Sequence, residues 1–303
     1  IWEQDSTYQS YIRPHWGKYN ILTIISDQFW AIAYQWNKII PGEKLEYFKG
    51  DWMKANILED HGPLCSLYKA HEEGSYGLKG DTDFDTGDFR SEGDSPSFMH
   101  AIGTGLRNLE SPGFGGWGGR YVNVRENTWL DPVSDPDYSY PAGRYYTSSA
   151  WGRKYMREEY PENQNLMRDY FNPITRWADA FQNDWAARAD WCVLSFKDAN
   201  HPPVVKLNHS TDLEVKPGAM INLSARPSND PDGDVLNYRW WFYREAGSYA
   251  GDIEIKNSGE QEASLVLPED ATKGETIHII CDVKDDGMPA LTRYKRLIIK
   301  VNE

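Results

Sequence analysis

Three carboxylates lie at a predicted strand end or helix start, the positions at which α/β folds bind ligands. Asp27 follows Tyr19–Ser26, a nearly continuous run of apolar β-formers that predicts a strand buried on both faces of a parallel sheet. Glu92 and Asp94 precede a helical pattern that opens at Ser95–Pro96. Ligands of open α/β sheets bind beyond the carboxyl ends of strands, and a helix N-terminus favours an ionised carboxylate. General-base activation of water is therefore open to Asp27 and Asp94, with a hydrogen-bonded loop residue and a helix cap as the respective alternatives.

Aromatic side chains are a second group of candidate functional residues, since the chain holds 13 Trp, 19 Tyr and 10 Phe. The glycine-rich loop Pro112–Tyr121 carries Trp117, whose ring we expect to be exposed or half-exposed, and Arg120. Tyr145 and Trp151 lie in or at the end of a turn-rich aromatic segment. Aromatic stacking with a fork of donors is a common way to hold a sugar, so these four residues are candidate substrate contacts. Anchoring of the loops by buried rings is the alternative.

Two acidic runs resemble cation-binding loops. Gly80–Asp88 alternates aspartates, but its glycine comes one place late for an EF-hand and no Glu closes the loop, which favours a solvated acidic loop. Asn229–Asp234, with the sequence NDPDGD, occurs elsewhere both as a plain tight turn and as a calcium-binding interdomain loop. Because Asp and Gly are good turn residues, the composition favours the turn.

Composition and motifs exclude several functions. A net charge of −14 and a pI of about 5.0 disfavour binding to phosphate backbones. There is no 18-residue apolar run, no GxSxG elbow and no histidine pair at metal spacing. The three cysteines lie far apart and show no disulfide framework, so each is expected to be a small buried hydrophobe: Cys65, Cys192 and Cys281.

The predicted secondary structure that positions these residues changes near residue 200, from mixed helices and strands to strands alone. Residues 1–199 predict part of an α/β open sheet, including a helix over about 173–191 whose Trp177, Phe181, Trp185 and Ala189 form a core stripe. In residues 200–303, short β-rich runs alternate with turn signals, which is typical of an all-β immunoglobulin-like sandwich. Trp240 or Trp241 is expected to fill its core.

Four motifs carry a family resemblance: Asp27-Gln28, the EGDSPS run at Glu92–Ser97, GGWGGRY at Gly115–Tyr121 and FQNDWAARADW at Phe181–Trp191. With them, the chain resembles the bacterial family of cellulose-binding proteins that have a nucleoside-hydrolase-like domain and a C-terminal immunoglobulin-like domain. The resemblance covers essentially the whole chain. It implies an extracytoplasmic, carbohydrate-associated protein that hydrolyses or binds glycosides from plant polysaccharide. The alternatives are a non-catalytic glucan-binding protein and, third, an N-ribosyl (nucleoside) hydrolase.

The resemblance also implies roles for the carboxylates. Asp94 matches the family's most specific motif, so it becomes the first candidate for a catalytic carboxylate and for a Ca²⁺ ligand, followed by Asp27; Glu92 is an acid, a supporting residue or a solvated loop residue. The closely spaced aspartates of nucleoside hydrolases, in a DxDxxxDD pattern after the first strand, do not precede Tyr19. We therefore expect the family's N-terminal half to be missing and another segment or a second chain to complete the sheet, because an incomplete sheet exposes an edge.

Overall fold

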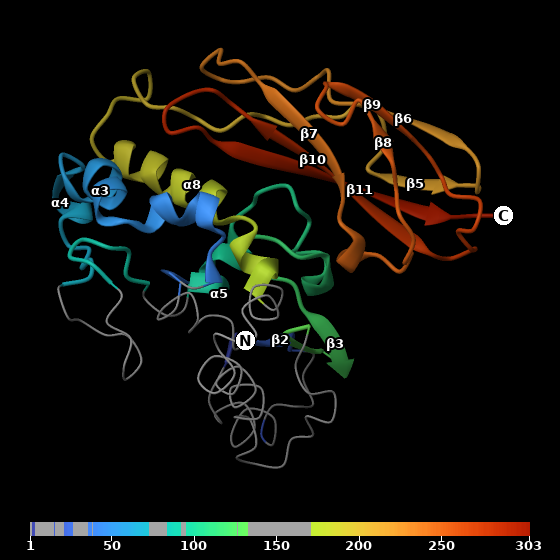
Figure 1. Ribbon diagram of the computed structural model, residues 1–303, viewed down its shortest axis with the longest axis horizontal. Helices are drawn as coiled ribbons and strands as arrows, with labels where there is room; N and C mark the ends of the chain where they lie inside the picture. The colour runs from blue at the N-terminus through green and yellow to red at the C-terminus, as the bar shows by residue number, and fades with distance from the viewer. Residues whose placement is uncertain are drawn as a thin grey trace. The chain divides into compact units, whose positions relative to one another are not determined.

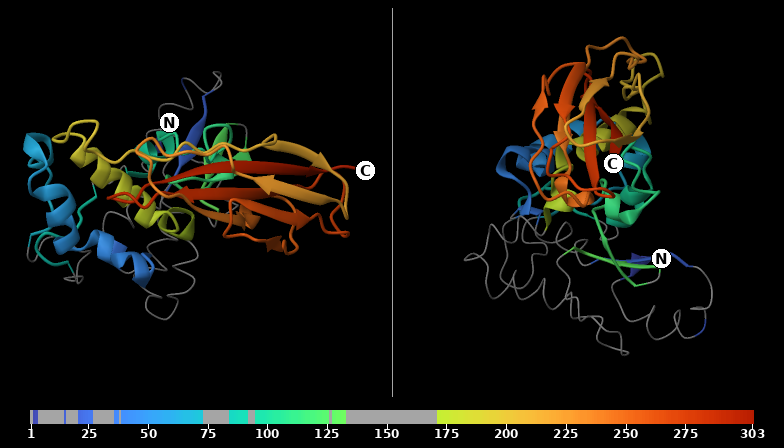
Figure 2. Two further views of the ribbon diagram at one scale, coloured as in Figure 1. Left: turned by 90° about the horizontal axis from the view of Figure 1, so that it is seen from above. Right: turned by 90° about the vertical axis from the view of Figure 1, so that its right-hand side faces the viewer.

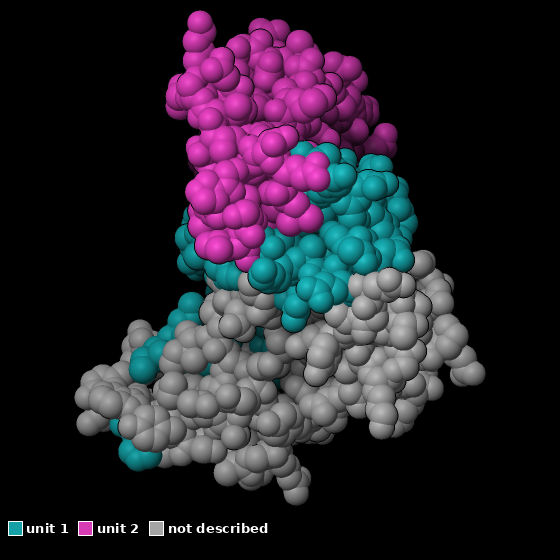
Figure 3. Space-filling model, turned by 90° about the vertical axis from the view of Figure 1, so that its left-hand side faces the viewer, with its two compact units in different colours: residues 1–55, 68–102, 108–179 teal, residues 56–67, 103–107, 180–303 magenta. Residues whose placement is uncertain are grey.

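A computed structural model of the chain describes residues 2–3, 15, 21–26, 36–37, 39–72, 84–91, 95–125, 127–132 and 171–303 (Figure 1). The chain divides into two compact units, coloured separately in Figure 3. Unit 1 comprises residues 1–55, 68–102 and 108–179, and unit 2 comprises residues 56–67, 103–107 and 180–303. These units group residues by proximity, so a domain boundary at 199/200 stays a prediction.

Unit 1 contains a four-stranded sheet in the order β1-β2-β4-β3. The strands are β1 (Trp2–Glu3), β2 (Thr23–Ile25), β3 (Val122–Arg125) and β4 (Thr128–Leu130). Strand β2 pairs in parallel with both β1 and β4, while β3 pairs antiparallel with β4. The parallel pairing of β1, β2 and β4 confirms the α/β prediction, although β2 is shorter than the apolar run that predicted it.

The helical segments are short except for one. They are η2 (Gly42–Phe48), α3 (Gly50–Met53), η3 (Lys54–Leu58), α4 (Gly62–Cys65), α5 (Ser95–Ala101), η4 (Pro112–Phe114) and α8 (Ala178–Asp190). Helix α8 confirms most of the helix predicted over 173–191. Of the predicted core stripe, Trp177, Phe181 and Ala189 are buried, whereas Trp185 is only half-buried. An aromatic cluster in unit 1 has the Trp36 ring centroid 5.3 Å from that of Phe48 and 5.2 Å from that of Phe84.

Helix α5 ends at Ala101, and glycines follow it at positions 103 and 105. Gly105, in unit 2, has φ of +96°, and a Cβ there would lie 2.0 Å from the backbone oxygen of Tyr294. The neighbouring Thr104 oxygen accepts a hydrogen bond from the Tyr294 N–H at 3.0 Å. This close backbone approach requires glycine, and it ties the segment Gly103–Arg107 to the edge of the sandwich.

The sandwich of unit 2 has two sheets, seen edge-on in Figure 2. One has the order β5-β11-β10-β7, from β5 (Asp212–Val215), β7 (Asn237–Phe242), β10 (Thr276–Lys284) and β11 (Thr292–Val301). The other has the order β6-β9-β8, from β6 (Met220–Ser224), β8 (Ile255–Lys256) and β9 (Glu262–Val266). The short 3₁₀ segment η5 (Arg244–Ala246) follows β7.

The predicted sandwich is confirmed, with one correction in its first strand. Seven of the predicted β runs form strands, whereas the run at Val204 forms only an isolated bridge to Asn229. Trp240 is buried in the core cluster and Trp241 is only half-buried. The core alternates along β10 and β11, where Ile279, Cys281, Leu297 and Ile299 face inward among apolar neighbours.

Strand β11 also buries a cation. Arg296 is fully buried, and its Nε donates to the Leu106 backbone oxygen at 2.6 Å. One of its terminal nitrogens lies 3.0 Å from His278 Nδ1, and its guanidinium lies 5.1 Å from the centroid of the Tyr243 ring. Burial first, then the charges of Arg296 and Arg107, lower the pKa of His278 to about 3, so its ring is neutral at neutral pH and can accept from Arg296.

The three thiols are free, but they are not alike. Cys65 and Cys281 are buried as predicted, whereas Cys192 is exposed, so the prediction for Cys192 is wrong. Cys192 follows the last residue of α8 by two positions, in a stretch of turns rather than in a core. Among the described residues, no helix is long and apolar enough to span a bilayer.

Candidate functional site

The carboxyl ends of two parallel strands bring a carboxylate and a hydroxyl together in unit 1. Ser26 follows β2 and Asp131 follows β4, and these strands are direct neighbours. The Ser26 hydroxyl donates to Asp131 Oδ1 at 3.0 Å. Asp131 is only 1% exposed, so its charge lies in a low-dielectric position at the sheet edge where α/β folds bind ligands.

Tyr121 lies next to this pair, beneath the glycine-rich loop. It is fully buried, and its hydroxyl donates to the Gly118 backbone oxygen. Burial first, and the negative charge of Asp131 second, raise the pKa of Tyr121 well above its usual range, with an opposing hydrogen bond from Ser26. Gly119 has φ of +105°, and a Cβ there would lie 2.9 Å from the Tyr121 hydroxyl, so the loop needs glycine to cover this ring.

His100 approaches the same tyrosine from α5. Its ring meets Tyr121 edge-on, with centroids 6.3 Å apart. Burial lowers the pKa of His100, which keeps the imidazole neutral at neutral pH. The site thus combines a carboxylate, a hydroxyl, a protonated phenol and a neutral imidazole, each at most 7% exposed.

The glycine-rich loop corrects one sequence expectation. Its hairpin-like bridge joins Gly116 and Gly119, and Trp117 points inward with 1% exposure. The expected exposed ring at Trp117 is therefore wrong, and the anchoring alternative describes its position. Arg120 is half-buried at the end of this loop, and its role as a ligand contact stays a prediction.

The other predicted site residues lie outside the described part of the chain: Asp27, Glu92, Asp94, Tyr145 and Trp151. Their catalytic or binding roles therefore stay predictions.

Asp131 is the residue that sequence reasoning missed. Its strand has only three residues, Thr128–Leu130, and a turn-rich segment follows it, so no strand was predicted there. The available signal was a short β-forming triplet followed directly by Asp, the same pattern of strand and polar residue that drew attention to Asp27.

The acidic run of unit 1 is partly structural. Asp88 is buried, accepts the Gly50 N–H at 2.9 Å and pairs with Lys49 Nζ at 3.0 Å. Asp85 is exposed and lies 3.5 Å from the same ammonium. Asp81 and Asp83 lie outside the described residues, so the prediction of a solvated loop holds at Asp85 and is wrong at Asp88.

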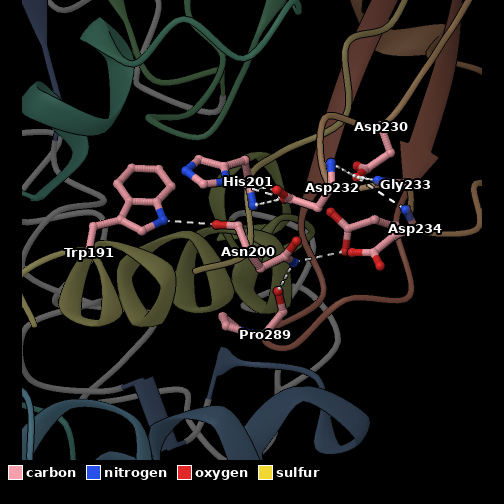
Figure 4. A network of polar contacts seen from close by, with 9 residues as sticks. Trp191, Asn200, His201, Asp230, Asp232, Gly233, Asp234 and Pro289 are labelled. Carbon is pink, nitrogen blue, oxygen red and sulfur yellow. Dashed lines mark hydrogen bonds and ion pairs between the residues drawn. The ribbon is translucent and has the colours of Figure 1, made fainter. Parts of the chain in front are cut away.

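In unit 2 the NDPDGD loop forms the predicted turn. Asp230 Oδ1 accepts the N–H groups of Asp232, Gly233 and Asp234 at 2.8, 3.1 and 3.3 Å (Figure 4). Asp232 is held by His201, through the backbone N–H at 2.6 Å and the ring Nδ1 at 3.1 Å. Partial burial, and then the charges of Asp230, Asp286 and Asp232, raise the pKa of Asp234.

Beside this loop the sandwich surface has a depression of about 550 Å³. Its lining is mainly polar: Ser228, Asn229, Asp230, Asp234, Leu236, Asn237, Tyr238, Gly259, Glu260 and Gln261. Gln261 Nε2 donates to the Tyr238 hydroxyl at 3.2 Å, which orients the half-buried ring. One aromatic ring among amide and carboxylate groups is a surface that suits a polyhydroxylated ligand.

Two sequence models of one protein family match an N-terminal and a C-terminal part of the chain. The model described as cellulose-binding Sde182, nucleoside hydrolase-like domain, matches residues 1–121. The model described as cellulose-binding protein Sde0182, C-terminal domain, matches residues 220–301. The chain belongs to this cellulose-binding family.

A solved structure agrees with the family. The Sde182-type chain is similar to a nucleoside hydrolase-related hypothetical protein from Saccharophagus degradans that is associated with carbohydrate metabolism, with 25% identity and a TM-score of 0.62. The likeness covers 92% of this chain and 62% of that protein, so the chain spans less than two thirds of its length. Family and fold class, an α/β part related to nucleoside hydrolases followed by an all-β part, are thus confirmed.

Other comparisons are weaker. The PKD domain from KIAA 1837 protein shows 15% identity and a TM-score of 0.24, covering 33% of this chain and 87% of that domain. The endo-fucoidan hydrolase MfFcnA9 from glycoside hydrolase family 107 shows 12% identity and a TM-score of 0.26, covering 46% of this chain and 20% of that one. Likenesses this low carry no argument about function. No curated protein sequence matches the chain.

Proposed function

We propose that this Sde182-family chain is an extracytoplasmic, carbohydrate-associated protein that binds glycosides from plant polysaccharide. The observation that carries the proposal is the match of both parts to models of a cellulose-binding family. The polar depression beside Tyr238 supports it, because sugar rings present an apolar face to an aromatic ring and hydroxyls to amides and carboxylates.

Retention on insoluble cellulose tests the binding proposal. The full chain is incubated with microcrystalline cellulose, and the bound fraction is measured against a non-binding protein. Asn237→Ala and Gln261→Ala remove two polar groups of the depression and should lower retention severalfold. Glu254→Ala removes an exposed side chain outside the depression and should leave retention unchanged. Absence of retention by the unaltered chain, on cellulose and on soluble glucans alike, would sink the proposal.

Hydrolysis of a glycosidic bond is a second candidate, favoured by the position of Asp131. A buried carboxylate at the carboxyl edge of a parallel sheet is placed to accept a proton from attacking water. Asp27, Glu92 and Asp94 are proposed to act with it, and Asp94 is proposed as a Ca²⁺ ligand. Asp131→Asn keeps an acceptor for Ser26 and removes the charge. It should abolish turnover of aryl glycosides in a folded protein, whereas full activity in this variant would remove Asp131 from the chemistry.

Two further parts of the proposal concern the surroundings of the protein. Another polypeptide segment or a second chain is proposed to complete the α/β sheet, which size measurement after co-expression with flanking coding sequence would test. A true nucleoside hydrolase stays the third candidate, and release of ribose from nucleosides by the complete protein distinguishes it from a glycosidase.

A further inference from the structure

The NDPDGD loop leaves one of its carboxylate oxygens without a protein partner. Asp230 Oδ1 is fully engaged by the turn, but Asp230 Oδ2 is buried and makes no hydrogen bond. Carboxylate oxygens of Asp230, Asp232 and Asp234 all lie within 4.8 Å of one another. Burial of an anionic oxygen without a hydrogen-bond partner costs free energy. The turn explains the contacts of Asp230 Oδ1, but it does not explain why Asp230 Oδ2 is buried.

A second, independent set of oxygens comes from outside the loop. Asn200 is 8% exposed and Asp285 is 1% exposed. Asn200 Nδ2 donates to the Pro289 oxygen at 2.8 Å and to Asp285 Oδ1 at 3.3 Å, which fixes the orientation of the amide. Asn200 Oδ1 and Asp285 Oδ2 are then left buried and without a hydrogen-bond partner.

The residues that carry these oxygens lie close together, since Asn200 hydrogen-bonds to Asp285 and lies beside Asp234. A Cβ on Gly287 would lie 2.3 Å from Asn200 Nδ2, 2.5 Å from Asn200 Cγ and 2.5 Å from Asp234 Oδ2, so Asn200 Cγ and Asp234 Oδ2 are no more than about 5 Å apart. Figure 4 shows the Asn200 side chain reaching toward Asp234 and the loop that carries Asp230 and Asp232. A Cβ at Gly287 would clash with both side chains, so glycine is what lets Asn200 and Asp234 approach each other this closely.

Among the residues that the structure describes, no lysine or arginine balances this charge. Within the described residues, Asp230, Asp234 and Asp285 form no ion pair with lysine or arginine, and His201 is committed to Asp232. The group is therefore three carboxylates and an amide oxygen with unused lone pairs, drawn from three segments of unit 2. Oxygen donors in an irregular, loop-built set are the preference of Ca²⁺, whereas Mg²⁺ demands a stricter octahedron.

We propose that Asp230, Asp234, Asp285 and the amide oxygen of Asn200 bind a calcium ion in the sandwich. The ion would join the linker at residue 200, the NDPDGD loop and the loop after β10. Its role is structural, since it would fix three loops that otherwise hold unsatisfied buried oxygens. The site differs from the cation proposed at Asp94, and it stands whether or not the protein binds cellulose.

Calorimetric titration of the metal-free full chain with Ca²⁺ tests the site. The unaltered chain should bind Ca²⁺ with a Kd of about 10⁻⁴ M or tighter, and Ca²⁺ should raise its melting temperature more than equimolar Mg²⁺. Asp230→Asn and Asp234→Asn each keep the shape of the side chain and remove one charge, so each should weaken this binding at least about tenfold. Asp252→Asn, an exposed carboxylate paired with Arg244, is the matched control and should bind like the unaltered chain.

Terbium luminescence gives a local measurement that does not alter a ligand. Trp191 Nε1 donates to the Asn200 backbone oxygen at 2.8 Å, so its indole lies close enough to sensitise a lanthanide in this site. Trp191→Phe should remove most of the Tb³⁺ emission that Ca²⁺ displaces, while Trp241→Phe should retain it. The proposal is overturned if Asp230→Asn, Asp234→Asn and the unaltered chain bind Ca²⁺ equally, or if Trp191→Phe leaves the displaceable emission unchanged.

Discussion

Both units bury a charged side chain in a sheet, but at different places along the strand. Arg296 lies inside the ten-residue strand β11, where it is opposite Ile280 of β10, while β5 pairs only with residues 298–301 of β11. Its guanidinium meets the Leu106 oxygen, neutral His278 and the ring of Tyr243. Asp131 instead comes one residue after the end of β4, where the strand pairing stops.

The difference separates a structural charge from one available for chemistry. A cation in mid-strand is surrounded by protein on all sides and contributes to stability only through the groups that it satisfies. A carboxylate at the carboxyl end of parallel strands lies where α/β proteins bind ligands. The comparison therefore predicts that removing Arg296 lowers the stability of the fold, and that removing the charge of Asp131 lowers ligand binding or turnover.

The largest effect on stability is expected for Arg296→Leu. This change leaves the Leu106 oxygen and His278 without their buried donor, and each unsatisfied polar group costs about 1–3 kcal/mol. We expect the free energy of unfolding to fall by about 3 kcal/mol, measured by urea denaturation with near-ultraviolet circular dichroism. Lys300→Ala, at an exposed position of the same strand, should cost under about 0.5 kcal/mol. Similar losses from both variants would mean that the Arg296 contacts contribute little.

The next largest effect is a dependence of stability on pH. The pKa of His278 is about 3 in the folded protein and 6.5 as the ordinary value, because burial, Arg296 and Arg107 outweigh the opposing charge of Asp212. Above pH 6.5 neither state binds the proton, so the full stability is present. Between pH 6.5 and pH 3 the unfolded chain binds a proton that the folded one does not, and stability falls by up to about 1.4 kcal/mol per pH unit.

Chemical denaturation at pH 7, 6 and 5 would measure this slope. His278→Gln keeps an acceptor near Arg296 and does not titrate, so its slope over this range should be shallower than that of the unaltered chain. Identical slopes for the two proteins would show that the pKa of His278 is the same in the folded and unfolded states.

The sandwich was predictable from sequence because its signals are local. Strand runs such as Thr276–Val283 alternate with turn residues, and Trp240 follows from the pattern of a sandwich core. Arg296 was not predicted as buried, since its partners Leu106 and His278 are 190 and 18 residues away in sequence. Long-range satisfaction of a charge has no local signature.

The α/β part was predictable in kind but not in detail. The apolar run before Asp27 located β2, whereas β4 is too short to be recognised and Asp131 was missed with it. Trp117 was assigned to a ligand surface because glycines surround it, yet those glycines allow the loop to fold over the rings of Trp117 and Tyr121. Glycine spacing alone does not indicate which way a ring points.

Asp131→Asn should separate function from stability. The amide can still accept from Ser26, and loss of a buried charge removes a desolvation cost, so the melting temperature should change little or rise. Ligand binding or turnover should fall in the same variant, measured on the glycosides named above. The control is Asp88→Asn, which weakens the contact with Lys49 and should lower stability by about 1–3 kcal/mol without affecting ligand. A functional role for Asp131 is contradicted if Asp131→Asn lowers stability as much as Asp88→Asn does and leaves ligand binding and turnover unchanged.

The smallest effect is expected where charges remain in water. Arg226 Nε lies 3.0 Å from Glu262 Oε1 across the edge of the sandwich, and both side chains are more than half exposed. Solvent screening and side-chain entropy offset most of the attraction, so Arg226→Ala should change the free energy of unfolding by under about 0.5 kcal/mol. A double-mutant cycle with Glu262→Ala isolates the coupling from other effects of each change. A coupling above about 1 kcal/mol would mean that exposed ion pairs also stabilise this sandwich. Burial would then not explain why Arg296 contributes more to stability than an exposed charge such as Arg226.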